Sequence, residues 1–149
     1  MNVGEICIRD VVVASRDATV AQAAQLMREF HVGDLVVVDE SGGRRIPAGI
    51  VTDRDVVIGV VAPGLDPAIL TAGDIMSGEL ITARESDGVF ETLQTMRRRG
   101  VRRLPVVDAA GALAGIVALD DILEIIAEEL GAAVKVAARE QTNEARRRR

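Results

Sequence analysis

The alternation of apolar and polar positions in the first half of the chain predicts five regular elements. The run from Leu35 to Val38 is short and almost continuously apolar, as in a strand buried on both faces. Thr19 and Gln22 form a capping box, after which apolar positions recur at helical spacing. In chain order we expect a strand at 11–14, a helix at 19–30, strands at 35–38 and 48–52 joined by a Gly42–Gly43 hairpin turn, and a helix from 53 to about 61 that stops at Pro63 and Gly64.

The second half repeats this order after a connector at residues 65–70. Thr71 and Asp74 give another capping signal, which predicts a short helix leading into the second block. Gly131 is expected to cap the last helix, and the polar stretch 132–149 should be a frayed, partly disordered basic tail. The other expected elements are a strand at 80–83, a helix at 87–99, strands at 103–107 and 113–118, and a helix at 119–130.

The two blocks are copies of one another, which decides the fold class. Val3–Cys7 matches Ala72–Met76, and VGDLVVVD at residues 32–39 matches VRRLPVVD at residues 101–108. The first copy has a longer Gly-rich turn, a change that a surface hairpin tolerates. We therefore expect a mixed α+β fold in which two tandem repeats pack as a pseudo-twofold pair. The expected divisions are repeat one at 1–64, the connector at 65–70, repeat two at 71–131 and the tail at 132–149.

Each copy contains a turn where an apolar strand ends and a helix begins, GIVTDRD at 49–55 and GIVALDD at 115–121. Together with the duplication and the LVVVD and LPVVD strands, these turns make the chain resemble the paired cystathionine-β-synthase domain, the CBS pair. The resemblance covers about Val3 to Leu130. The stretch 51–76 is most similar to small stand-alone CBS pairs of the hypoxic-response type. This resemblance implies a disc with two ligand clefts between the repeats.

The resemblance to CBS pairs also implies an adenosyl ligand such as AMP, ADP, ATP or S-adenosylmethionine, bound as a regulatory ligand and not as a required cofactor. In the family, the Asp of a Thr-x-x-Asp turn accepts hydrogen bonds from ribose, while the Thr and the helix start face the phosphates. This chemistry is consistent, because a carboxylate offers only acceptors to the hydroxyl donors of ribose. Apolar strand ends of the other repeat would enclose the adenine.

One of the two clefts carries the full family pattern. Thr52 and Asp55 match the turn, with Arg54 between them. Resemblance to the nucleotide-sensing subunit of AMP-activated kinase assigns phosphate contacts to the basic residues Arg102 and Arg103. The expected binding residues are Thr52, Arg54, Asp55, Thr82, Ala83, Val101, Arg102, Arg103, Leu104 and Pro105.

The other cleft departs from the pattern. Asp121 keeps the ribose carboxylate, but Ala118 lacks the hydroxyl of Thr52. Asp34 stands at the position equivalent to Arg103, where it would repel a phosphate. We expect this degenerate cleft to be empty or to take an uncharged adenosyl group. Its expected residues are Ser15, Gly33, Asp34 and Asp121.

Several of the candidate residues have a second, structural interpretation. Thr52 and Asp55 also fit a helix capping box, and that role is compatible with ligand binding. Arg102 and Arg103 could equally belong to a solvated basic face together with Arg97–Arg99, which are expected to face solvent. The sequence leaves these interpretations side by side.

The single His and the single Cys are expected to be structural. His31 ends a helix, aligned with Gly100, and fits a C-terminal cation or spacer better than a metal ligand, because the chain has no second His. Cys7 aligns with Met76 and fits a small core side chain, with an intermolecular disulfide as the alternative. The sequence contains no catalytic triad, metal cluster or phosphate loop, so we expect neither an enzyme nor a metal site.

Composition narrows the functional class. The 149 residues are 48% apolar and carry a net charge of −5, with two Phe, no Trp and no Tyr. An acidic chain without aromatic platforms argues against general nucleic-acid binding. The single Cys and the lack of a signal core or membrane span predict a soluble cytoplasmic protein. The terminal run Arg146–Arg149 could bind nucleic acid or a partner, but a short disordered end is the favoured interpretation.

The sequence thus predicts an adenine-nucleotide-sensing regulatory module that acts on an unidentified protein or through its own dimer. The alternative is a CBS pair that has lost ligand binding and serves as a scaffold or interaction module. A homodimer is expected because helices 53–61 and 119–130 carry more Val, Ile and Leu than one half can bury. The expected exposed apolar patch comprises Ile58, Val61, Ile122, Ile125 and Ile126.

Overall fold

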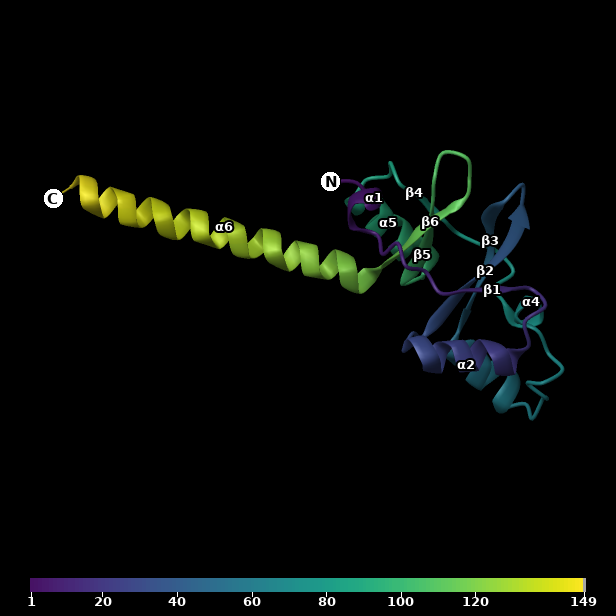
Figure 1. Cartoon of the computed structure of the whole chain (residues 1–149). Coiled ribbons are helices and arrows are strands. Elements are labelled where there is room, and N and C mark those ends of the chain that lie inside the picture. The colour runs from purple at the N-terminus through teal and green to yellow at the C-terminus, as the bar shows by residue number, and fades with distance from the viewer. Residues whose placement is uncertain (149) are drawn as a thin grey trace.

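The computed structural model describes residues 1–148 and contains two three-stranded sheets, one in each repeat (Figure 1). In repeat one, the first strand is parallel and the third strand antiparallel to the central one. The predicted order of strand, helix, strand, strand and helix is confirmed. The elements are β1 (Val13–Ser15), α2 (Val20–Phe30), β2 (Asp34–Ser41), β3 (Arg44–Thr52), α3 (Asp53–Val56) and a π-helical turn, η1 (Val57–Val61).

Repeat two has the same order and the same pairing directions. The register shifts after Val37 in repeat one and after Val106 in repeat two, which are equivalent positions in the two sheets. The duplication therefore extends to local irregularities of the strands, and the mixed α+β tandem fold is confirmed. The elements are β4 (Ala83–Arg84), α5 (Val89–Arg99), β5 (Arg103–Val107), β6 (Leu113–Ala118) and α6 (Leu119–Arg147).

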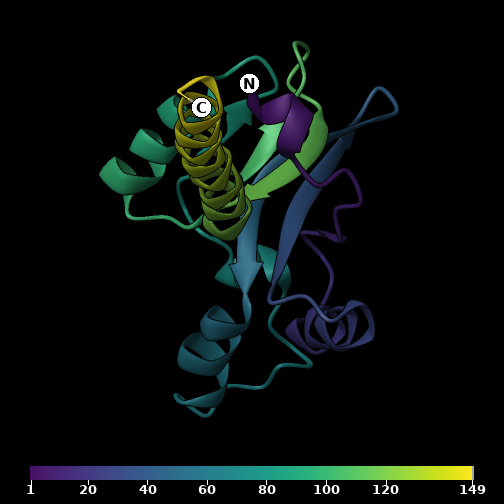
Figure 2. The same cartoon turned by 90° about the vertical axis from the view of Figure 1, so that its left-hand side faces the viewer.

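The short helices that precede the two repeats are exchanged between them. α1 (Val3–Ile6) lies at the start of the chain, yet Val3 is fully buried in the core of repeat two, among residues such as Leu104. α4 (Ala72–Ile75) leads into repeat two, yet Ala72 is fully buried in the core of repeat one. Figure 2 shows α1 lying over the sheet of repeat two. The two halves are thus intertwined, and neither core is complete without a segment from the other half.

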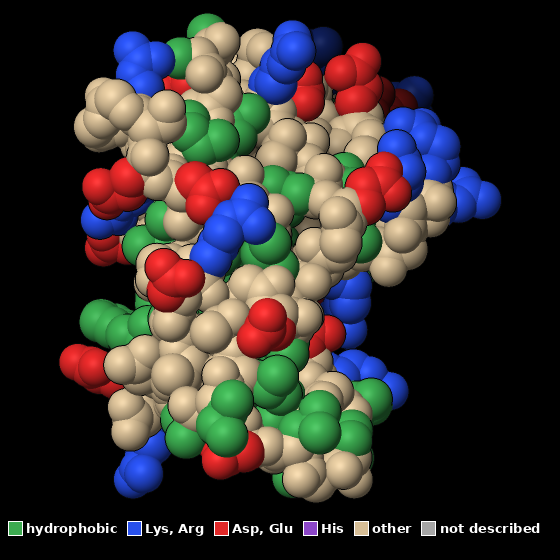
Figure 3. All heavy atoms as spheres, turned by 90° about the vertical axis from the view of Figure 1, so that its right-hand side faces the viewer, with side chains coloured by type: hydrophobic (Ala, Val, Ile, Leu, Met, Phe, Trp, Pro, Cys, Tyr) green, Lys and Arg blue, Asp and Glu red, His purple; other side chains and the backbone are tan. Residues whose placement is uncertain are grey.

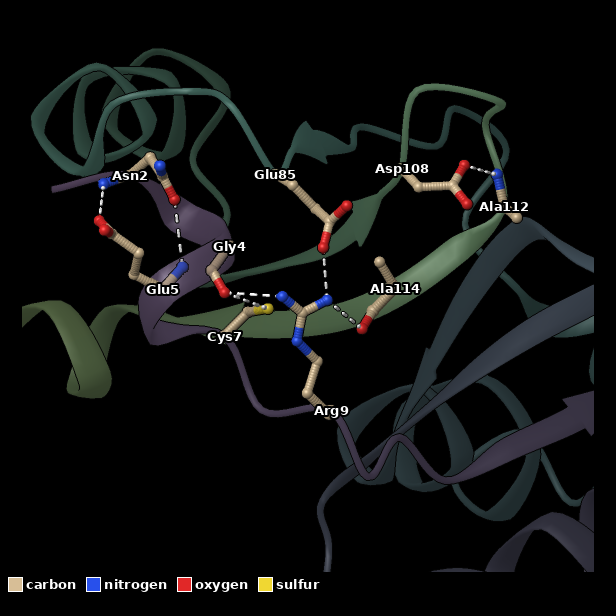
Figure 4. Close-up of polar contacts among 9 residues, drawn as sticks. All are labelled: Asn2, Gly4, Glu5, Cys7, Arg9, Glu85, Asp108, Ala112 and Ala114. Atoms are coloured by element: carbon tan, nitrogen blue, oxygen red, sulfur yellow. Dashed lines mark hydrogen bonds and ion pairs between the residues drawn. The ribbon is translucent and has the colours of Figure 1, made fainter.

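Arg9 fastens the N-terminal segment to repeat two (Figure 4). Its guanidinium donates hydrogen bonds to the Glu85 carboxylate, to the Ala114 carbonyl at 3.1 Å, and to the Gly4 carbonyl at 2.7 Å. Glu85 and Ala114 belong to repeat two, whereas Arg9 and Gly4 belong to the N-terminal segment. This clamp explains why a segment that precedes β1 packs against the other repeat.

Cys7 lies half-buried against the core of repeat two, as expected for a small core side chain. Burial raises the pKa of its thiol above the ordinary value, while the nearby Arg9 acts in the opposite direction. Burial, the largest effect, therefore favours the neutral thiol, which packs as a small apolar group.

The last helix does not end at Gly131, so that prediction was wrong. α6 continues to Arg147, and Gly131 lies inside it without the positive φ of a helix-ending glycine. The residues that follow include Ala132 and Ala133, which are the best helix formers and offset the cost of about 1 kcal/mol for an interior Gly. The stretch predicted to be a partly disordered tail is therefore helical over residues 132–147, and Arg149 lies outside the described residues.

Three smaller predictions about elements need correction. β1 and β4 begin two and three residues later than expected, because the ladder pairing with the neighbouring strand starts only at Val13 and at Ala83. The predicted helix 53–61 keeps its span, but its second half is the π-helical turn η1. Ile122, expected in the exposed patch, is fully buried in the core of repeat two.

Candidate functional site

A cleft of about 520 Å³, here called cleft one, lies between the end of β3 and the start of β5. Repeat one supplies the turn Thr52–Asp55, and repeat two supplies residues 100–104 together with the segment before β4. The two repeats therefore enclose the cleft jointly, as expected. Of the ten predicted residues, those that line it are Thr52, Arg54, Asp55, Val101, Arg102, Arg103 and Leu104.

Three predicted residues do not line cleft one. Ala83 is 2% exposed and pairs with Val106 inside the sheet of repeat two, and Pro105 is fully buried. Thr82 is exposed outside the cleft. The error follows from the position of β4, since the prediction had this strand ending at Ala83 and facing the cleft.

The segment before β4 takes the place of these residues. Leu80 and Ile81 line cleft one, and the backbone N–H of Ser77 donates to the Ile50 carbonyl at 3.2 Å, which holds this segment against β3. The apolar pair Leu80 and Ile81 was the available signal, but both residues were assigned to the predicted strand 80–83, whereas they precede β4. The lining residues missed by the sequence analysis are Ile50, Asp53, Ser77, Glu79, Leu80, Ile81 and Gly100.

Thr52 and Asp55 form the capping box that the structural interpretation predicted. The Asp55 N–H donates to Thr52 Oγ1 at 3.1 Å, and the Thr52 N–H donates to Asp55 Oδ2 at 2.8 Å. The cap uses only one carboxylate oxygen, and both residues line the cleft. Asp55 can therefore hold the helix start through Oδ2 and still accept a hydrogen bond from a ligand through Oδ1.

The two arginines at the basic end of cleft one are paired with carboxylates. Arg103 Nε lies 3.4 Å from Asp34 Oδ1, and Arg102 Nη2 lies 3.5 Å from Asp120 Oδ1. The Arg102–Asp120 pair is largely solvent-exposed, whereas the Asp34 side chain is only 12% exposed. Arg102 and Arg103 thus form part of the cleft wall, and each has an intramolecular counter-ion.

Asp34 is the electrostatically unusual group of this region. Burial raises the pKa of its carboxyl above the ordinary value, the nearby Asp53 carboxylate raises it further, and Arg103 acts in the opposite direction. Burial is the largest of these effects. Asp34 therefore keeps its charge at an energetic cost, and Arg103 partly offsets that cost.

A smaller cleft of about 210 Å³, here called cleft two, lies at the pseudo-symmetric position. Asp34, Asp121 and Ala118 line it, as predicted, but Ser15 and Gly33 do not. Ser15 is exposed at the end of β1, and Gly33 instead lies beside the Asp53 carboxylate. Arg103 lines both clefts.

Cleft two is acidic and shares the family turn only in part. The Ala118 N–H donates to Asp121 Oδ2 at 2.8 Å, which repeats half of the Thr52–Asp55 cap. Asp10 and Asp120 add further carboxylates to its wall, against the single cation of Arg103. Within residues 1–148, no cluster of three or more His, Cys, Asp and Glu side chains has a geometry suited to a metal ion.

Comparison with known proteins assigns the family. The CBS domain model matches the chain twice, over residues 3–61 and 72–128. The chain belongs to the CBS-domain family. A crystal structure of a CBS domain pair in complex with 5′-methylthioadenosine and S-adenosyl-L-methionine matches 87% of this chain and 98% of that chain. The TM-score is 0.75 and the sequence identity 25%.

Two relatives extend this family assignment. An uncharacterised protein of Methanopyrus kandleri is 43% identical over 125 residues, which are 84% of this chain and 62% of that protein, so this CBS pair spans less than two thirds of it. Hypoxic response protein 1 of Mycobacterium tuberculosis is 34% identical over 128 residues, which are 86% of this chain and 82% of that protein. The predicted resemblance to this type of CBS pair is confirmed. No helix among the described residues combines the length and apolar character that a membrane crossing requires.

Proposed function

We propose that this CBS pair is a regulatory module that binds one phosphorylated adenosine ligand, of the AMP, ADP or ATP class, in cleft one. The observation that carries the proposal is the joint presence, in one cleft, of Thr52, Asp55 and two arginines. The ribose diol would donate to Asp55 Oδ1, and the adenine would lie against apolar residues such as Ile50 and Ile81. The complex of the related CBS pair with two adenosyl compounds supports the adenosyl part of this ligand.

Binding of a phosphate requires an exchange of ion-pair partners. Arg103 would turn from Asp34 to the ligand phosphate, leaving a largely buried carboxylate in cleft two without its counter-ion. Removing one partner of such a pair is costly, so part of the binding energy would be spent on this exchange. The ligand state of cleft one is thereby coupled to the electrostatics of cleft two, which gives the module a physical basis for signalling to a partner.

The alternative function is a ligand-free scaffold, and one observation favours it. Arg102 and Arg103 already have carboxylate partners, and Asp55 already caps a helix, so every proposed binding group has a structural role. A thermal-shift panel with AMP, ADP, ATP, S-adenosylmethionine and NAD separates the two functions. A ligand at 100 times its Kd should add about 2.7 kcal/mol of stability. No shift at millimolar concentration with any of them would support the scaffold.

Titration calorimetry with ATP tests the assignment of the cleft. We expect one site per chain and a loss of about tenfold or more for Asp55→Asn, because a charge-assisted hydrogen bond contributes roughly 1.5–3 kcal/mol. Arg103→Ala should weaken ATP more than adenosine. Asp121→Asn is the matched control at the equivalent position of cleft two and should change little. Two sites per chain, or a larger loss for Asp121→Asn, would show that the working cleft is the other one.

One further variant tests the exchange of partners. Asp34→Asn removes the competitor for Arg103 without touching cleft one itself. We expect ATP to bind about two- to fivefold tighter, because an ion pair with a partly exposed Arg is worth up to about 1 kcal/mol. Unchanged or weaker binding by Asp34→Asn, alongside a clear loss for Arg103→Ala, would rule out the exchange while leaving the cleft assignment intact.

A further inference from the structure

The distal half of α6 has no cover within the chain. The helix has 29 residues, which corresponds to a length of about 43 Å, and Figure 1 shows it projecting far from the two repeats. Its main contacts with other elements are with α5 and β6, and residues 131–148 are all exposed. Helices in proteins gain most of their stability from packing an apolar face against another element. The side chains on the projecting half of α6 therefore indicate which partner packs against it.

One face of α6 carries a continuous apolar stripe. Leu123, Leu130 and Val134 are 52%, 66% and 63% exposed, and their spacing places them within roughly 40° of one another around the helix. Small or uncharged residues continue the same face between these residues and beyond them toward the C-terminus, which allows another helix to approach closely. With Ala127, Ala138, Gln141 and Ala145 they form what is here called the α6 stripe.

Charges beside the α6 stripe are segregated along the helix. On one side of the stripe, Glu124 and Glu128 occupy the half near the body of the molecule, while Lys135, Arg139 and Arg146 occupy the distal half. The division falls at the small residues 131–133, close to the middle of α6. If two copies of α6 lie antiparallel, the acidic half of this side in one copy therefore faces a basic half of similar length in the other.

We infer that the α6 stripe binds the α6 stripe of a second copy of this chain in an antiparallel helix pair. A two-fold axis near residue 132 sets Leu130 of each copy against Val134 of the other. It also brings Glu124 and Glu128 of one copy alongside Lys135 and Arg139 of the other. Antiparallel packing brings the same side of both helices together, whereas parallel packing would set Glu124 and Glu128 beside the opposite side of the partner helix, where Glu129 lies at the same height. A second copy supplies the complementary pattern by itself, which is why it is the occupant.

Charge reversal in the full-length protein tests this pairing by analytical ultracentrifugation at low salt. Glu124→Lys with Glu128→Lys makes this side of α6 wholly basic, and Lys135→Glu with Arg139→Glu makes it largely acidic. Each double variant alone should self-associate about tenfold or more weakly than the wild type, since favourable pairs become repulsive. An equimolar mixture of the two should associate at least as tightly as the wild type. Glu29→Lys with Glu40→Lys, which changes the same charge on exposed residues of repeat one, is the control and should change nothing.

Cysteine cross-linking determines the direction of the pair. Leu123→Cys mixed with Gln141→Cys should form a disulfide between the two chains, identified by mass spectrometry so that native Cys7 is accounted for. Leu123→Cys alone should not link to itself. A disulfide that joins two chains of the Leu123→Cys variant through position 123 would overturn the antiparallel arrangement. A wild-type protein that stays monomeric, or double variants that associate like the wild type, would show that a second copy is not the occupant of the α6 stripe.

Discussion

At the scale of single residues, two glycines set how closely the exchanged segments approach the sheets. A Cβ on Gly115 would lie 2.6 Å from Cys7 Sγ and 2.9 Å from the Ile8 carbonyl oxygen, and one on Gly49 would lie 2.7 Å from Met76 Sδ. Gly49 pairs with Val37 and Gly115 with Val106, at equivalent positions of the two sheets. Both repeats therefore have glycine at the position where the sheet contacts the segment that completes its core, because a larger side chain would clash there.

Gly115→Ala should destabilise the protein by about 1–3 kcal/mol, because the new methyl group meets backbone that cannot move aside. Urea denaturation followed by circular dichroism measures the change. Gly59→Ala is the control, since a Cβ there meets nothing within 4 Å and Gly59 lies in η1. It should be neutral or slightly stabilising. Equal effects of the two substitutions would contradict the packing account.

Asp34 gives the stability of the molecule a predictable dependence on pH. Its folded-state pKa is raised by burial, so the folded protein holds this proton more tightly than the unfolded chain does. Protonated Asp34 therefore contributes its full stability to the folded state below the pKa that it has in the unfolded chain. This stability is lost as the pH rises through the higher pKa of the folded state. Asp34→Asn cannot ionise and escapes this loss.

We therefore expect the unfolding free energy of Asp34→Asn, relative to the wild type, to increase as the pH rises from about 3.8 and then to level off. The gain at pH 7 should be up to about 1 kcal/mol, because the partly exposed Arg103 offsets some of the burial cost. Chemical denaturation of both proteins at several pH values measures it. A relative stability that falls with rising pH would contradict the assignment.

At the scale of elements, the ends of α2 and α5 show how the repeats diverge. Both helices end in a left-handed residue, Gly100 with φ 65° in α5 and His31 with φ 53° in α2. The alignment of His31 with Gly100 correctly indicated a helix end. Within residues 1–148, His31 is the single non-glycine residue with positive φ, a conformation that costs a side chain about 1–2 kcal/mol.

His31→Gly should stabilise the protein by about 0.5–1 kcal/mol, since relief of the left-handed strain exceeds the added freedom of the unfolded chain. Gly100→Ala should destabilise it by a similar amount, because alanine would have to adopt the left-handed conformation. Thermal denaturation of the two variants beside the wild type checks both signs. Loss of stability in His31→Gly would show that the imidazole makes a contribution larger than the strain.

The elements that the sequence predicted well are those whose signal is local. Capping boxes and apolar periodicity located α2, α3 and α5, and the duplication fixed the order of the strands. The exchange of α1 and α4 was not predictable, because their matching sequences show that they are equivalent but not which sheet each one covers. The length of α6 was missed because a single Gly was weighed above the helix formers that follow it.

In the candidate site too, local features were predicted and long-range contacts were not. Thr52 and Asp55 are neighbours on one turn, so their joint position follows from sequence. The ion pair between Arg103 and Asp34 does not, because it joins the starts of β5 and β2, which only the packing of the two repeats brings together. Sequence reasoning placed the two side chains in different clefts, whereas the structure puts Arg103 in the walls of both.

At the scale of the whole molecule, apolar surface remains exposed on repeat one. Figure 3 shows apolar side chains gathered near the lower end of one face, where the chain passes through η1 and the connector. Of the predicted patch, Ile58 and Val61 are 52% and 63% exposed, and the neighbouring Val57, which was not predicted, is 55% exposed. Ile125 and Ile126 are only half-buried, whereas Ile122 is fully buried and does not contribute. Contiguous apolar surface of this kind marks an interface.

We predict that this surface of η1 mediates a homodimer distinct from the pairing of α6. Ile58→Lys with Val61→Lys places four charges in a two-fold interface and removes its apolar contacts, so the dimer Kd should rise at least about a hundredfold. Light scattering at micromolar concentration measures the mass, and Phe90→Lys, which changes a 68% exposed side chain on α5, is the control. If both the η1 surface and the α6 stripe self-associate, the wild type forms assemblies larger than a dimer. The η1 substitutions and the α6 charge reversals should then each abolish one of the two associations. A mass unaffected by the η1 substitutions would show that this surface faces solvent, because burying two lysines per copy in an interface would leave their charges unpaired.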